Sequence, residues 1–307
     1  MCTALYFPVG GGYLGRTLDL EHGYWEQVTV TPAGYLGNRY AIVGMAANHQ
    51  GYPLYFDGLN EAGLGMAGLN FPHSARYQPD LRDTVTVAPY ELIPTVLGRC
   101  GSVDQAVSLL RGLRLCHRSP GPEYPVASLH WMLTDGARCV VVESTETGLH
   151  ILDNPGGVLT NEPPLPHQLS LLKNYAHLSA TQPQEGWQQP LSRGTGAVGL
   201  PGDYSSPGRF VRGAFVLANA APTDQPVGQL FHLLDTVAVP KGCVRLPDGG
   251  QVITRYAACM DLRRRTYYYR TYGCHRIHAV ALGRQSLAAD TLTTFPLPEQ
   301  EDIKWEN

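Results

Sequence analysis

The N-terminal segment MCTALYFPVGGGYLGRTLD (residues 1–19) decides the interpretation of this chain, because a cysteine directly follows the initiator methionine. The small side chain of Cys2 favours removal of Met1, which leaves a thiol and a free α-amine on one residue. An α-amine has a pKa of roughly 7.7–8.0 and a thiol of about 8.5, so the amine can accept the thiol proton near neutral pH. Such a residue needs no separate histidine as base. The segment therefore predicts a cysteine nucleophile at the mature N-terminus.

Arg16 and Asp19 lie three positions apart on a segment that should run beside the first strand. A buried arginine would favour the thiolate form of Cys2. An aspartate would hold and charge-balance the α-ammonium group. The alternative is a structural ion pair between Arg16 and Asp19, and the local pattern leaves both interpretations open.

Outward from this segment, strand-like and helix-like segments come in blocks along the chain. The predicted strands cover residues 3–7, 13–18, 39–45, 64–71, 129–134, 138–143, 149–153, 158–160, 252–260, 266–272 and 276–282. The predicted helices cover residues 90–98, a segment that starts at Ser102, and residues 167–178, 209–218 and 227–237. Ser102 and Gln105 match a capping box. Blocks of strands and helices indicate stacked sheets with helical layers, in one α+β domain over residues 1–307.

Composition excludes several functional classes. The chain has 307 residues with a net charge of -3, and it has no basic stripe of the kind that nucleic-acid-binding proteins carry. No apolar stretch is long enough to span a bilayer, and the start lacks a secretory signal. Seven cysteines without short paired spacings favour free thiols and a cytoplasmic location over a disulfide framework. The pairs Cys116-His117 and Cys274-His275 cannot easily turn both side chains to one ion, so we expect no metal.

Ordered blocks along nearly the whole chain resemble the choloylglycine hydrolase family, which comprises conjugated bile salt hydrolases and penicillin V acylases. The blocks are MCT (1–3), GRTLD (15–19), DGLNE (57–61), AGLNFP (67–72), LHWM (129–132), GVLTN (157–161), GTG (194–196), GLPGDY (199–204), RFVR (209–212), YAACM (256–260) and TYYY (266–269). So many blocks in order are far more specific than any single motif.

The resemblance implies a four-layer αββα sandwich of the N-terminal-nucleophile hydrolase type. It assigns Cys2 as nucleophile and base and implies a thioester intermediate, with no metal or cofactor. It also implies a small-molecule acyl amide as substrate, and a homotetramer as the assembly. Five further residues would complete the catalytic network, with Asn161 as the oxyanion-hole candidate: Arg16, Asp19, Asn70, Asn161 and Arg209.

The choice of substrate within the family depends on two positions. Thr17, in the sequence Arg16-Thr17-Leu18-Asp19, matches many penicillin V acylases, whereas bile salt hydrolases of the family usually have Asn there. Asn70 matches the bile salt hydrolases, whereas penicillin V acylases usually have Tyr. We give Asn70 more weight because it should face the ligand, so the sequence favours conjugated bile salts. Penicillin V or another N-acyl amide is the alternative, and a non-catalytic steroid- or acyl-binding relative is a third interpretation.

A steroid pocket should be mostly apolar with a few polar groups. Leu18 directly precedes Asp19, and Tyr24 follows soon after, so both are candidates for the pocket wall. Tyr52, Tyr55 and Phe56 would form an aromatic loop at the mouth. The alternative for all five is an ordinary position in the core or on the surface.

Overall fold

The structure is a computed structural model that describes residues 1–81, 85–182 and 192–307. Two large antiparallel sheets form its centre. In spatial order, the seven-stranded sheet contains β12 (Val158–Leu159), β1 (Cys2–Phe7), β2 (Tyr13–Leu20), β14 (Gln251–Asp261), β15 (Thr266–Thr271) and β16 (His278–Ala281), and β13 (Val244–Arg245) pairs with β14. The eight-stranded sheet contains β11 (Gly148–Asp153), β10 (Cys139–Thr145), β9 (Leu129–Thr134), β6 (Gly65–Asn70), β5 (Tyr52–Asn60), β4 (Ile42–His49), β3 (Gln27–Thr31) and β17 (Thr293–Phe295).

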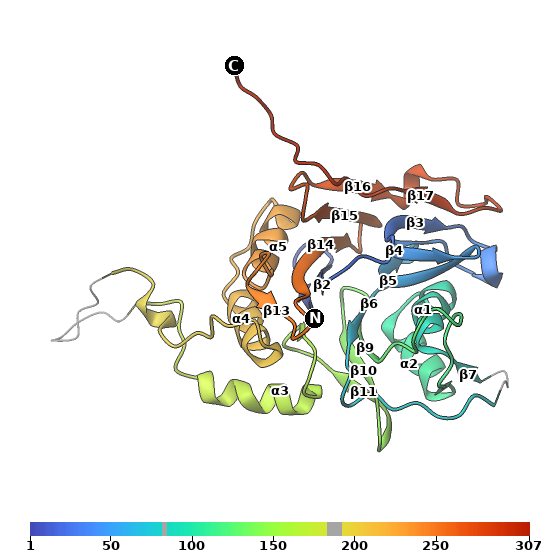
Figure 1. Ribbon diagram of the computed structural model, residues 1–307, viewed down its shortest axis with the longest axis horizontal. Coiled ribbons are helices and arrows are strands. Elements are labelled where there is room, and N and C mark those ends of the chain that lie inside the picture. Colours follow the sequence, from blue (N-terminus) through green and yellow to red (C-terminus); the bar gives the residue numbers. More distant parts are fainter. Residues whose placement is uncertain (82–84, 183–191) are drawn as a thin grey trace.

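Helices cover the outer face of each sheet (Figure 1). The helices are α1 (Leu92–Arg99), α2 (Val103–Arg111), α3 (Leu165–Leu172), α4 (Ser206–Ala218) and α5 (Pro226–Asp235). α4 and α5 contact the seven-stranded sheet at β1, β2 and β14, and α1 contacts the eight-stranded sheet at β5 and β6. Helix, sheet, sheet and helix make four layers, so the predicted αββα architecture is confirmed. A short parallel pair, β7 (Thr86–Val87) with β8 (Arg114–Leu115), lies outside the two sheets.

Strand β1 is buried on both faces, because it lies between the other sheet and the helical layer. Successive side chains of a strand point to opposite faces. Leu5 packs toward Gly213 of α4, while the Tyr6 hydroxyl donates to the main-chain oxygen of Gly136 in the β9–β10 turn at 2.5 Å. Gly12 ends the turn that leads into β2 at a φ of 93°, and a Cβ there would lie 2.7 Å from Gly136 Cα. Glycine at this position allows the hairpin to approach the second sheet.

Most predicted elements are present, with shifted ends. The predicted strand at residues 39–45 begins only at Ile42, because the N–H groups of Arg39 and Tyr40 donate to Gly98 O in the last turn of α1 instead of pairing in the sheet. Ser102 caps α2 by accepting from Gln105 N at 3.3 Å. The Gln105 side chain bonds to Gly101 N, one residue before the cap, so the capping box is only partly formed.

The expected aromatic loop at residues 52–56 is wrong, because these residues form the first half of strand β5. β5 pairs with β4 along its length, and the position opposite Pro53 is Asn48 in β4. Gly51 lies in the β4–β5 turn, and the strand begins directly after it in spite of Pro53. Strands β3 and β17 were also missed.

No helix in the described part of the chain is long and apolar enough to cross a membrane.

Candidate active site

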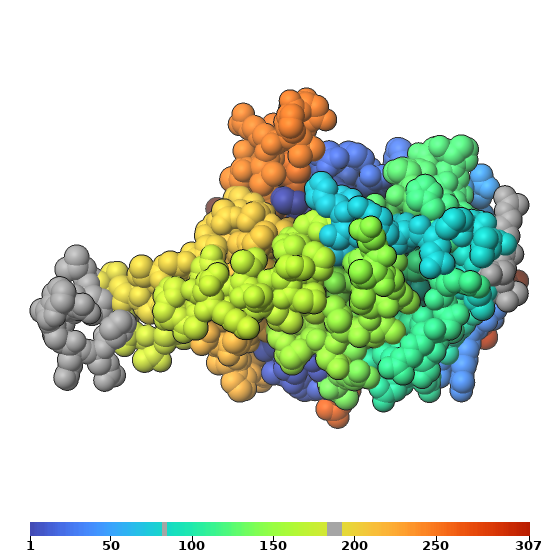
Figure 2. Space-filling model, turned by 90° about the horizontal axis from the view of Figure 1, so that it is seen from below, coloured from blue at the N-terminus to red at the C-terminus, as the bar shows by residue number. Residues whose placement is uncertain are grey.

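The β1–β2 hairpin places Cys2 directly opposite Leu18, and Ala4 opposite Arg16. Because side chains alternate, Arg16 and Leu18 face the eight-stranded sheet, whereas Asp19 faces the helical layer. Cys2 is buried, with 3% of its surface exposed. Figure 2 shows the deep-blue N-terminal end between the cyan, yellow and orange segments of the chain. The predicted nucleophile therefore lies where segments distant in the sequence meet.

Arg209, in the first turns of α4, binds the main chain of Cys2. Its Nη1 donates to Cys2 O at 2.5 Å and to Thr3 Oγ1 at 2.7 Å. Its Nη2 donates to Asn161 Oδ1 at 2.7 Å, and the same oxygen accepts from Cys2 N at 3.0 Å. Burial lowers the pKa of the Arg209 guanidinium, while the negative charge of Asp19 opposes this shift. Arg209 and Asn161 together fix both main-chain ends of Cys2.

Asp19 is fully buried and accepts hydrogen bonds from two threonines, from Thr254 Oγ1 at 2.6 Å and from Thr17 Oγ1 at 3.3 Å. Burial raises the pKa of its carboxyl group, and the positive charges of Arg209 and of the chain N-terminus oppose this rise. The Met1 ammonium donates to the main-chain oxygen of Asp19 at 2.5 Å. The carboxylate therefore lies within electrostatic range of an N-terminal ammonium group.

Arg16 forms its ion pair across the sandwich, with Asp57 of β5 at 2.9 Å, so a structural Arg16–Asp19 pair is not formed. The hydroxyls of Tyr256 and Tyr267 donate to the two oxygens of the same Asp57 carboxylate. Burial acts to lower the pKa of Arg16, but electrostatic interactions with Tyr256, Cys2 and the Asp57 carboxylate hold it well above its ordinary value. Arg16 Nε has no partner among the described residues, although it is buried.

Asn161 and Asn70 are brought together from two loops. Asn161 follows β12 and is buried, whereas Asn70 ends β6 and its side chain is exposed. Asn161 Nδ2 donates to the main-chain oxygen of Asn70 at 2.8 Å. An amide nitrogen carries two hydrogens, so this bond leaves a second N–H for a ligand. The amide of Asn161 thus links Cys2, Arg209 and the Asn70 segment.

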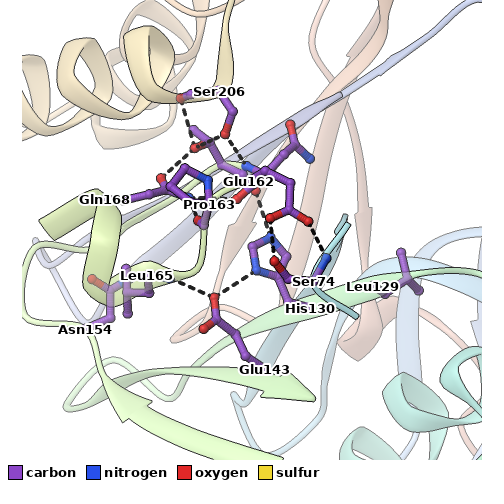
Figure 3. A network of polar contacts seen from close by, with 12 residues as sticks. Ser74, Leu129, His130, Glu143, Asn154, Glu162, Pro163, Leu165, Gln168 and Ser206 are labelled. Carbon is purple, nitrogen blue, oxygen red and sulfur yellow. Dashed lines mark hydrogen bonds and ion pairs between the residues drawn. The ribbon is translucent and has the colours of Figure 1, made fainter. Parts of the chain in front are cut away.

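The loop that carries Asn161 is itself held by a network of hydrogen bonds (Figure 3). The N–H of Asn161 donates to Ser206 Oγ at 2.8 Å, and its C=O accepts from Gln168 Nε2 at 2.7 Å. One residue earlier, the main-chain oxygen of Thr160 lies 2.9 Å from His130 Nε2. These contacts come from α3, α4 and β9, so the loop is fixed from three elements.

A β-bulge sets the direction of the side chains at residues 55–57. Met45 pairs with Asp57 and Ala46 pairs with Tyr55, so Phe56 has no partner in β4. A bulge inserts one residue and re-aims the side chains around it. Phe56 packs against the core cluster that contains Cys2, and Asp57 reaches Arg16, while Tyr55 joins the core under α1.

The predicted pocket residues divide into two groups. Leu18 is the cross-strand neighbour of Cys2, and the Tyr24 ring lies 6.3 Å from the Phe56 ring, so these three lie on the side of Cys2. Tyr55 and Tyr52 lie away from Cys2. The Tyr55 hydroxyl contacts Thr31 Oγ1 at 2.8 Å inside the outer core, and the Tyr52 ring packs edge-on against Tyr90 at 5.8 Å. Strand alternation explains this correction, because Tyr55 points to the outer face of β5 and Phe56 to the inner face.

A cavity of about 830 Å³ opens beside the segment that carries Tyr24. Trp25, Arg255, Tyr272 and Leu297 are among its lining residues. None of the predicted catalytic residues lines it. In this structure the cavity is therefore separate from the thiol.

The sequence patterns did not assign any role to Asp57, Tyr256 or Tyr267. All three lie within the blocks that carried the family resemblance, in DGLNE (57–61), YAACM (256–260) and TYYY (266–269). The three residues are far apart in the chain, so no local sequence pattern predicts that they come together. Only the face-to-face packing of the two sheets brings them to Arg16.

Comparisons with known proteins agree with this arrangement. The family model of the linear amide C–N hydrolases, choloylglycine hydrolase family, matches residues 2–295. A bile salt hydrolase/transferase of Lactiplantibacillus plantarum is 40% identical over 314 residues, with 97% of each chain covered. A bile salt hydrolase/transferase of Clostridium perfringens is 32% identical over 317 residues, with 96% of each chain covered.

Solved structures match over the same extent. The crystal structure of a variant of conjugated bile acid hydrolase from Clostridium perfringens superposes with a TM-score of 0.95 at 31% identity and covers 100% of both chains. A penicillin V acylase from Agrobacterium tumefaciens superposes with a TM-score of 0.78 at 20% identity, covering 97% of this chain and 92% of that one, and shows the fold alone. The chain therefore belongs to the linear amide C–N hydrolases of the choloylglycine hydrolase family.

Proposed function

We propose that this enzyme hydrolyses the amide bond of glycine- or taurine-conjugated bile salts, with Cys2 as the nucleophile. The observation that carries the mechanism is the position of the Cys2 nitrogen, 3.0 Å from Asn161 Oδ1 and on the same residue as the buried thiol. The full-length relatives at 40% and 32% identity, both described as bile salt hydrolase/transferases, support the substrate class.

The reaction begins after removal of Met1, when the Cys2 nitrogen becomes a free amine. The amine takes the thiol proton, and the thiolate attacks the carbonyl carbon of the substrate amide. The carbonyl oxygen becomes an oxyanion, and the C–N bond breaks as the α-ammonium returns its proton to the leaving amine. Water, deprotonated by the same amine, then hydrolyses the thioester and releases the acid.

Charge balance at Cys2 assigns roles to three neighbours. The Asp19 carboxylate, fully buried, offsets the α-ammonium that forms during the reaction. Arg16 stabilises the thiolate, and Asp57 offsets part of its charge from the opposite side. Arg209 orients Cys2 by donating to the main-chain oxygen of Cys2, so the sulfur and the amine keep a fixed direction.

The oxyanion would be stabilised by the second N–H of Asn161 Nδ2, with Asn70 beside it. A neutral donor fixed in advance in a buried site stabilises developing charge without reorganisation. Asn161 meets this condition, because its main chain and its side chain are all hydrogen-bonded. The exposed side chain of Asn70 faces outward, where it can contact the ligand.

Thr17, the position that matches penicillin V acylases, lies away from the proposed acyl pocket. Its hydroxyl donates to Asp19 on the helical side of β2, so the residue acts on the carboxylate and not on the acyl group. Leu18, Tyr24 and Phe56, on the other face, would form the apolar wall for a steroid. Asn70 leaves more space there than a tyrosine.

We expect a higher kcat/KM for glycocholate or taurocholate than for penicillin V. Burial of several steroid methylenes, at about 0.8 kcal/mol each, favours the larger acyl group. Asn70→Tyr should narrow the difference, because a tyrosine fills the space and stacks on the phenoxy ring, worth roughly 0.5–1.5 kcal/mol. Thr17→Asn is the matched variant and should change the ratio less.

The test is amine release from the three substrates, measured side by side on the unmodified enzyme and both variants. If the unmodified enzyme has the higher kcat/KM for penicillin V, the proposed function is wrong and the enzyme is a penicillin V acylase. Retention of the ratio in Asn70→Tyr would remove Asn70 from substrate selection.

The same proposal includes the organisation of the enzyme. Residues 1–307 would form a single amidohydrolase domain that assembles as a homotetramer in the cytoplasm, as the family resemblance implies. The mass of the enzyme in solution at working concentration tests the assembly directly.

A further inference from the structure

We propose that Glu162 is a positioning residue that clamps the segment after Asn70 to the loop that carries Asn161. The proposal rests on the proposed function, because it assigns the two asparagines to the same substrate carbonyl. It adds a residue that touches neither the thiol nor the reacting atoms.

The Glu162 carboxylate closes the gap between the two segments with three hydrogen bonds (Figure 3). Its Oε1 accepts from His73 N at 2.8 Å and from Ser74 N at 2.8 Å. Its Oε2 accepts from Ser74 Oγ at 2.7 Å. Hydrogen bonds to an ionised acceptor are about twice as strong as neutral ones, so the carboxylate is an effective anchor for two consecutive main-chain N–H groups.

The Asn161 side of this clamp is rigid. Gln168 Nε2 donates to the main-chain oxygens on either side of Glu162, those of Asn161 at 2.7 Å and Pro163 at 2.6 Å. Two residues further on, Leu165 N donates to the buried Glu143 carboxylate at 3.0 Å. The backbone of Glu162 is therefore held on both sides, and its carboxylate transmits that position to residues 73 and 74.

On the Asn70 side, Phe71 is buried against the His130 ring and its N–H donates to Ser128 O at 2.8 Å, so Glu162 acts on the turn that follows, at residues 72–74. Asn70 is exposed at the end of β6, and Pro72 and His73 after it are exposed as well. Asn161 Nδ2 donates to Asn70 O, so a shift of this segment would redirect the Asn161 amide together with the Asn70 side chain. A displacement of about 1 Å at a positioning group can lower the rate by about 10²-fold. The Glu162 carboxylate thus helps to set the positions of both the Asn161 amide and the Asn70 side chain.

The test uses Glu162→Ala, Glu162→Gln and the control Glu146→Ala, which removes an exposed glutamate in the β10–β11 turn. In Glu162→Ala we expect kcat to fall about 10- to 100-fold, with a smaller change in KM. Glu162→Gln keeps an oxygen for the two N–H groups and a donor for Ser74, so it should recover most of the rate. Glu146→Ala should behave as the unmodified enzyme.

Two further measurements separate positioning from general damage. Hydrogen exchange at the His73 and Ser74 amides should speed up in Glu162→Ala and stay slow in Glu162→Gln. The rate at which iodoacetamide labels Cys2, measured with Cys243→Ser because Cys243 is exposed, should not change.

Unchanged exchange at the two amides would overturn the clamp, whatever the activity. A normal kcat together with faster exchange in Glu162→Ala would show that the clamp does not position Asn70 and Asn161 for catalysis. Loss of kcat together with loss of Cys2 labelling would place Glu162 in support of the nucleophile instead. The exchange experiment needs no substrate, so a failure of the proposed function, seen as no turnover in the unmodified enzyme, is distinguished from a failure of the clamp.

Discussion

Cys2→Ala should abolish turnover of every acyl amide and leave the fold intact. The substitution removes the sulfur that forms the thioester, and neither Arg16 nor Asp19 can replace it as a nucleophile. The cost in stability should be about 1 kcal/mol, typical for the loss of one buried group of this size. Amine release and the thermal unfolding midpoint of the purified variant measure the two effects.

Two companion variants sharpen this result. Cys2→Ser should be nearly inactive, because a hydroxyl ionises far less readily than a thiol near neutral pH. Cys243→Ser removes an exposed cysteine on the loop before β13 and should keep full activity. Full activity in Cys2→Ala would remove the whole mechanism.

Asn161→Ala should lower kcat by roughly 10²–10³, the usual cost of one lost oxyanion donor, with less change in KM. The structure adds a second cause, since the Asn161 oxygen also accepts from Cys2 N and from Arg209. Asn161→Asp keeps an oxygen for Cys2 and Arg209 but can donate neither to the oxyanion nor to Asn70 O, so it removes the donor roles while the contacts to Cys2 and Arg209 remain.

The measurement is kcat and KM of both variants with glycocholate, together with their iodoacetamide labelling rates. Asn161→Asp should lose most of the rate and still label at Cys2. If both variants change only KM, Asn161 belongs to substrate binding and another donor must hold the oxyanion.

Sequence alone predicted the layers of this fold and the residues around Cys2. Strand periodicity and helix caps are local signals, which is why β1, β2 and β9 were predicted close to their true ends and α2 close to its true start. Asn161 and Arg209 came from the family blocks, and the structure brings both to the main chain of Cys2.

The missing parts depend on contacts that no local pattern encodes. The partner of Arg16 is Asp57 in the opposite sheet, 41 positions away, rather than Asp19 on its own strand. The bulge at Phe56 arises from the register between β4 and β5, and it allows Asp57 to reach Arg16 although the neighbouring Phe56 also packs on the inner side. Glu162 reaches Ser74 across 88 positions, and its own neighbourhood, Asn161-Glu162-Pro163, looks like an ordinary turn.

The central claim is that Cys2 works as a free N-terminal residue, and intact mass spectrometry of the active enzyme tests it most directly. In the Cys243→Ser protein, the mass of an active preparation should be one methionine short of the 307-residue chain. After iodoacetamide treatment to complete inactivation, the protein should carry one label, located on Cys2 by fragmentation. A fully active preparation that retains Met1, or one inactivated without a label on Cys2, would contradict the account.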